Sequence, residues 1–68
     1  MNYAVVFEQT ENNFSAYVPD LPGCVATGAT LDECRRNITL AIQMHLKGME
    51  EDHLPLPERM SLAEMVRA

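Results

Sequence analysis

Apolar and polar residues alternate in two short runs near the start of the chain, residues 3–8 and 14–18. This alternation is typical of a β-strand, in which successive side chains point to opposite faces. One face carries Tyr3, Val5, Phe7, Phe14, Ala16 and Val18, and the other carries Ala4, Val6, Glu8, Ser15 and Tyr17. The segment between the runs, Thr10–Asn13, contains asparagines, which tolerate the left-handed backbone of tight turns. The pattern therefore predicts a β-hairpin.

A segment rich in proline and glycine follows the second run. Pro19 and Pro22 have a fixed φ and no backbone N–H, so this segment cannot be the middle of a strand or helix. Gly23 can take a positive φ and turn the chain. The residues after the turn, Cys24–Thr27, are expected to form a short third strand, and Gly28 follows its last residue.

A helical pattern begins after this loop. Thr30 and Glu33 have the spacing of a capping box, in which the threonine oxygen accepts a hydrogen bond from the amide three residues on. Apolar residues then recur in steps of three and four: Leu31, Cys34, Ile38, Ala41, Ile42, Leu46 and Met49. The helix is predicted to run to about Lys47, with Gly48 as the residue just past its end.

The C-terminal part of the chain predicts extended backbone and then a short helix. Pro55 and Pro57 push the residues before them out of the helical region. Ser61 and Glu64 repeat the capping-box spacing, so a short helix is expected over Ser61–Val66. The fold class is therefore α+β, with a three-stranded antiparallel sheet covered by one main helix. Residues 1–60 are expected to form the domain and 61–68 a helical tail.

Length and charge limit the function classes. A chain of 68 residues has a marginal core, and self-association is a common way to stabilise one. We expect a homodimer or homotetramer, formed through the sheet face that carries Ala4, Val6, Ser15 and Tyr17. The net charge of −5 disfavours binding to DNA or RNA phosphates and is compatible with a basic protein partner. No apolar run reaches the length of a membrane span, which favours a cytoplasmic protein.

Catalytic and metal chemistry find little support in the sequence. Cys24 and Cys34 lack a metal-ligand spacing; Cys34 is expected in the core and Cys24 more exposed. A disulfide between them is the minor alternative. Glu8 and Asp20 are the carboxylates that could converge in a metal-dependent nuclease or hydrolase. We expect no catalytic residue, metal or cofactor, and keep the nuclease as an alternative.

The chain resembles the HicB-like family, the antitoxin side of HicA/HicB toxin–antitoxin pairs. The resemblance rests on the hairpin residues 3–7, on the segment Phe14–Cys24 with its Val-Pro-Asp-Leu-Pro-Gly-Cys sequence, and on Thr27–Glu33. It extends over about residues 1–60 and implies a partial RNase H-like domain that binds and neutralises a small basic ribonuclease toxin similar to HicA. Many members add a C-terminal DNA-binding domain. The eleven residues after Pro57 are too few for one, so direct DNA binding is not expected.

The toxin-binding surface implied by the resemblance is acidic. The candidate residues are Asp20, Asp32, Glu33, Glu50, Glu51 and Asp52. An orphan oligomeric binding module without a toxin remains the main alternative function.

Overall fold

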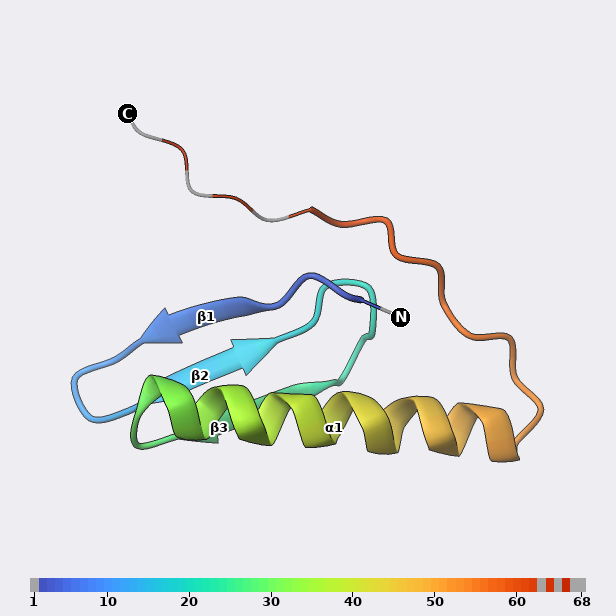
Figure 1. Ribbon diagram of the computed structural model, residues 1–68, viewed down its shortest axis with the longest axis horizontal. Coiled ribbons are helices and arrows are strands. Elements are labelled where there is room, and N and C mark those ends of the chain that lie inside the picture. Colours follow the sequence, from blue (N-terminus) through green and yellow to red (C-terminus); the bar gives the residue numbers. More distant parts are fainter. Residues whose placement is uncertain (1, 63, 65, 67–68) are drawn as a thin grey trace.

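The chain folds into a small sheet with one long helix packed along it. The computed structural model describes residues 2–62, 64 and 66. Strands β1 (Val6–Gln9), β2 (Phe14–Tyr17) and β3 (Val25–Gly28) form an antiparallel sheet in the order β1-β2-β3, and α1 (Leu31–Glu51) covers one face of it (Figure 1). The predicted α+β architecture of three antiparallel strands and one main helix is confirmed.

The sheet register places the alternating residues as predicted. Val6 lies opposite Tyr17 and Phe7 opposite Ala16, and Tyr17 in turn lies opposite Val25. The buried core toward α1 consists of Ala16, Val18, Leu21, Cys24, Cys34 and Ile38. Partly buried residues from the same strand faces, Val5, Phe7, Phe14 and Ala26 among them, pack against it. Complete burial of a side chain such as Leu21 or Ile38 contributes about 1.5–3 kcal/mol.

The first two strands are shorter than the sequence predicted, because the loop limits the pairing. The ladder between β1 and β2 ends at the pair Val6–Tyr17, just before Pro19 turns the chain away from the sheet. Residues 3–5 therefore precede the ladder although Tyr3 and Val5 still pack on the core. The third strand begins at Val25 and includes Gly28, one residue later than predicted at each end.

The start of α1 agrees with its capping-box prediction. Thr30 has an extended backbone, with φ −125° and ψ 163°, and its side-chain oxygen accepts a 3.1 Å hydrogen bond from the Glu33 N–H. Gly28 lies directly beneath this first turn. A Cβ at Gly28 would lie against the Cys34 backbone nitrogen and 2.8 Å from the Cys34 Cα. The absence of a side chain at Gly28 therefore allows α1 to begin close to β3.

The predicted end of α1 was wrong by about one turn. The helix continues through Gly48 to Glu51, and His53 is the residue with a positive φ, 58°. The Leu54 N–H donates to the Met49 carbonyl at 2.9 Å and the His53 N–H to the Glu50 carbonyl at 3.1 Å. These two bonds form a Schellman motif, which satisfies the last carbonyls without glycine. Glycine within a helix costs only about 1 kcal/mol, too little to end one.

The tail after α1 is extended rather than helical where the structure describes it. Residues 61, 62, 64 and 66 are not helical, and residues 63 and 65 of the predicted helix Ser61–Val66 lie outside the described residues. The physical reason is a competing partner for Ser61. Its N–H and hydroxyl bond the Asp20 carboxylate instead of capping a helix. The division between a domain at 1–60 and a tail at 61–68 stays a prediction.

Candidate functional site

The proline-containing loop is part of the core rather than a free binding loop. Within it the Leu21 N–H donates to the Val18 carbonyl at 3.1 Å, and the Cys24 N–H donates to the Leu21 carbonyl at 3.0 Å. Gly23 has φ 83°, in the region that glycine favours, so the predicted turn is confirmed. Leu21 is 0% exposed and Cys24 4% exposed. Cys24 is more exposed than Cys34, as expected, but both thiols are buried, and burial raises the pKa of the Cys24 thiol.

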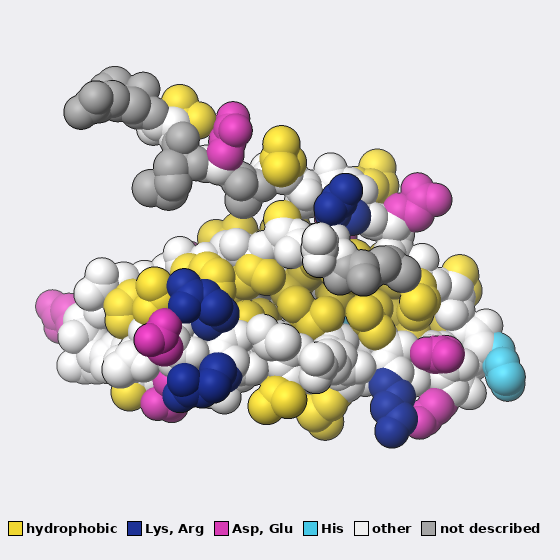
Figure 2. Space-filling view, in the orientation of Figure 1, with side chains coloured by type: hydrophobic (Ala, Val, Ile, Leu, Met, Phe, Trp, Pro, Cys, Tyr) yellow, Lys and Arg dark blue, Asp and Glu magenta, His cyan; other side chains and the backbone are white. Residues whose placement is uncertain are grey.

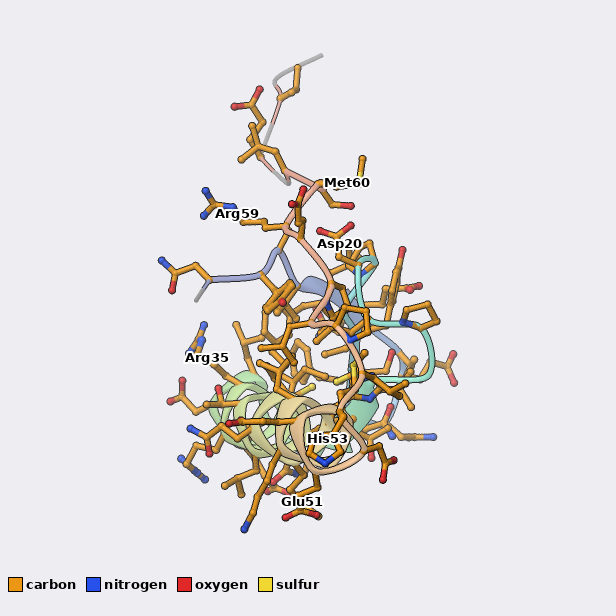
Figure 3. The ribbon with its side chains drawn as sticks, turned by 90° about the vertical axis from the view of Figure 1, so that its right-hand side faces the viewer. Asp20, Arg35, Glu51, His53, Arg59 and Met60 are labelled. Carbon is orange, nitrogen blue, oxygen red and sulfur yellow. The ribbon has the colours of Figure 1, made fainter. Side chains whose placement is uncertain are left out.

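Asp20 joins this loop to the C-terminal tail. One carboxylate oxygen, Oδ2, accepts from the N–H groups of Met60 and Ser61, and the other accepts from the Ser61 hydroxyl, each at 2.8 Å (Figure 3). The backbone N–H of Ser61, then that of Met60, holds the pKa of Asp20 below its ordinary value. The Tyr3 hydroxyl donates to the Pro57 carbonyl at 2.6 Å. Each of these contacts joins residues at least 40 positions apart in the chain, and no spacing in the sequence predicts them.

The six acidic residues predicted to bind a partner do not form one patch. Asp32 and Glu33 lie in the first turn of α1, while Glu50 and Glu51 end it. At 1.5 Å per residue these two ends are about 30 Å apart. Figure 3 shows Asp20 beside Met60 and away from Glu51. The acids therefore divide into the loop residue Asp20, the helix start and the helix end.

The helix end is the most concentrated negative feature of the three. Glu50, Glu51 and Asp52 are consecutive and exposed, and the last turn of α1 contains no basic residue. The carbonyls at a helix C-terminus carry a partial negative charge that adds to theirs. At the helix start Asp32 instead forms a 2.8 Å ion pair with Arg35, whose guanidinium lies 5.9 Å from the centre of the Phe7 ring. We define Glu50, Glu51 and Asp52 as the acidic helix end.

The sheet face opposite α1 carries the residues predicted for self-association. By register, Val6, Tyr17 and Val25 form one row across the three strands. Tyr17 is 41% exposed and Val25 64% exposed, whereas Ser15 lies between Glu8 and Thr27 in the polar row beside it. The sequence prediction did not include Val25. The alternation within the short third strand nevertheless indicates that Val25 and Ala26 lie on opposite faces of the sheet. We call Val6, Tyr17 and Val25 the outer sheet row.

The structure does not bring the nuclease candidates together. Glu8 pairs with Ser15 near the hairpin turn, whereas Asp20 follows the other end of β2. Among the described residues no group of three His, Cys, Asp or Glu side chains could hold a metal ion.

Cys24 and Cys34 are both free and buried. His45 is partly buried on α1. No helix within the described part of the chain is long and apolar enough to cross a membrane.

Comparison with known proteins gives the class: the model of the HicB-like antitoxin of bacterial toxin-antitoxin systems matches residues 3–68. The chain therefore belongs to the HicB-like antitoxin family, as the resemblance in its hairpin and loop predicted. The proteins that define this family are antitoxins of bacterial toxin-antitoxin systems.

Individual relatives agree with the family assignment. The chain is 45% identical over 49 residues to a UPF0150 protein of Helicobacter pylori, covering 72% of this chain and 68% of that protein. It is 40% identical over 58 residues to an uncharacterised 14.9 kDa protein from the rep-hol intergenic region of Haemophilus phage HP1, covering 85% of this chain but only 44% of the phage protein.

A solved structure supports the same fold. A chain of the HicA3 and HicB3 toxin-antitoxin complex superimposes with a TM-score of 0.72 and 27% sequence identity, covering 87% of this chain and 70% of that one.

Proposed function

We propose that this chain binds and neutralises a small basic ribonuclease toxin of the HicA type. The proposal rests on family membership and on the similarity to a chain of the HicA3 and HicB3 complex. The observation in this chain that carries it is the acidic helix end, where three consecutive exposed carboxylates extend the negative pole of α1. A basic partner is attracted to such a surface, which raises its association rate.

The acidic helix end is the part of the predicted surface most available to a partner. Asp20 already accepts three hydrogen bonds from the tail, and Asp32 is paired with Arg35. The residues Glu50, Glu51 and Asp52 are therefore proposed as the first contact with the toxin. Asp20, Asp32 and Glu33 contribute to the overall negative field.

Self-association through the sheet is a separate part of the proposal. The outer sheet row, with Ser15 and Ala4 beside it, presents partly exposed apolar side chains that a second copy could cover. Burial of an apolar row between two copies removes it from water and supports a homodimer, or a homotetramer if a further surface takes part. The negative charge of the chain does not favour direct DNA binding.

Co-expression with a small basic protein of the HicA type, encoded by a gene adjacent to that of this chain where one is found, tests the proposed function. We expect a stable complex on purification of the tagged chain, and recovery of growth when both proteins are present. The triple variant Glu50→Lys, Glu51→Lys, Asp52→Lys should associate more slowly with the toxin, with a weaker dependence on salt. Cations at a helix C-terminus are favourable, so the variant should still fold.

A matched control separates local charge from total charge. The variant Glu11→Lys, Glu58→Lys, Glu64→Lys changes the net charge by the same amount at exposed positions away from the acidic helix end. It should associate faster than the helix-end variant. Equal association rates for the two variants would show that the acidic helix end is not the first contact with the toxin. Failure of the wild-type chain to form any complex, with no recovery of growth, would leave an orphan oligomeric module.

A further inference from the structure

The outward side of α1 carries apolar residues that the core does not use. Leu40 is 57% exposed and Met44 is 73% exposed, one helical turn apart. Arg36 and Lys47, both exposed, lie one turn before and after this pair. In Figure 2 hydrophobic surface reaches the outer side of the helix between basic side chains nearer its two ends. This surface lies opposite the stripe of Cys34 and Ile38, which faces the sheet.

Three residues on this side of α1 have a regular spacing. Glu33, Leu40 and Lys47 are seven residues apart, and residues with this spacing lie on one line along a helix. All three are exposed, and among the described residues neither Glu33 nor Lys47 has an ion-pair partner. The line therefore presents a negative, an apolar and a positive side chain in that order. We call Glu33, Leu40 and Lys47 the heptad line.

We propose that the heptad line pairs α1 with α1 of a second copy in antiparallel orientation. A two-fold axis through Leu40 places this leucine against Leu40 of the second copy. The same axis places Glu33 against Lys47 of the second copy and Lys47 against its Glu33, which forms two symmetric ion pairs. The parallel orientation would place like charges together, so charge order selects the antiparallel one.

The flanking residues fit the same arrangement. With Leu40 on the axis, Arg36 lies opposite Met44 of the second copy, because both are four residues from Leu40. The aliphatic stem of arginine can cover the exposed methionine while its guanidinium stays in water. Both apolar residues of this helix face, Leu40 and Met44, are thereby removed from solvent.

A second copy fits this face better than a basic toxin does. The cations of Arg36 and Lys47 would repel a basic protein and attract an acidic one. A partner must supply an apolar side chain opposite Leu40 and an acid opposite Lys47 at a seven-residue spacing, and α1 supplies both. The face lies on the other side of the domain from the outer sheet row, so the two surfaces could act together in a tetramer.

The test is the assembly state of the purified chain without any toxin, so its outcome is independent of the proposed toxin binding. We would measure mass by sedimentation over a range of concentrations for the wild type, Glu33→Lys, Lys47→Glu and the double variant. By symmetry each single variant replaces two attractions with two repulsions. We expect each to weaken the helix-mediated association about 30-fold, about 2 kcal/mol, and the double variant to restore it.

Two further variants keep the result interpretable. Glu11→Lys changes the net charge as Glu33→Lys does, at an exposed turn, and should leave the assembly unchanged. Leu40→Gln should weaken assembly with little dependence on salt, whereas the charge variants should respond to salt. A wild type that stays monomeric overturns the inference, and so do single charge variants that assemble as the wild type does. Circular dichroism verifies that each variant is folded.

Discussion

Replacement of Gly28 by alanine tests the close packing of α1 on β3. The added Cβ would lie against the Cys34 nitrogen, 2.8 Å from the Cys34 Cα and 3.0 Å from the Glu33 carbonyl carbon. These are backbone atoms of the first helical turn, so no side chain can rotate away to make room. The start of α1 must therefore move outward, and it carries the buried Cys34 away from core neighbours on the sheet such as Ala16.

The expected cost follows from this overlap. Overpacking of a well-filled core costs about 1–3 kcal/mol, and a rigid backbone neighbour places Gly28→Ala at the upper end. For a domain of this size, each kcal/mol lowers the melting temperature by about 4–8 °C. We expect urea and thermal unfolding, measured by circular dichroism at a fixed protein concentration, to show a loss of about 2–3 kcal/mol.

Gly48 provides the matched control for this substitution. Nothing lies within 4 Å of a Cβ built at Gly48, which is inside α1. Gly48→Ala should therefore raise stability by about 1 kcal/mol, because alanine has the higher helix propensity. Equal effects at the two glycines, or a Gly28→Ala variant as stable as the wild type, would refute the close approach of α1 to β3.

Two further predictions concern the helix end and the tail. His53→Gly should raise the free energy of unfolding by about 1 kcal/mol because it relieves the left-handed backbone, whereas His53→Ala, which keeps a Cβ, should not. Asp20→Asn should speed amide hydrogen exchange at Met60 and Ser61, and unchanged exchange would contradict the role of the carboxylate. Because the folded pKa of Asp20 is lowered, the stabilisation from these contacts should be complete above about pH 4 and be lost as pH falls through that lowered pKa, which an NMR titration of the two amides can follow.

The sequence predicted the features that depend on neighbouring residues. Strand faces follow from a period of two, and the start of α1 follows from Thr30 and Glu33, which interact within one turn. The end of α1 was predicted wrongly because a glycine such as Gly48 often follows the last residue of a helix. In this chain the helix instead ends where His53 adopts a left-handed backbone conformation. The antitoxin family could be identified because its loop residues form a distinctive local sequence.

Features that join distant parts of the chain could not be predicted in the same way. The Asp20 contacts with Met60 and Ser61 replace the helix predicted at Ser61, and they depend on where the tail passes the loop. Six acidic residues looked like one candidate surface in the sequence, although α1 separates its two ends by about 30 Å. Which of them lie close together therefore became apparent only in three dimensions.

Inhibition of RNA cleavage tests the central claim most directly. A purified small basic protein of the HicA type that forms a complex with this chain would be incubated with RNA and increasing amounts of the wild-type chain. The helix-end variant and its matched control would be measured in parallel. The proposed function predicts that cleavage falls with added wild-type chain and stops near a fixed stoichiometry, with the helix-end variant less effective than the control. Cleavage that continues unchanged at a large excess of wild-type chain would contradict the claim that this protein neutralises a ribonuclease toxin.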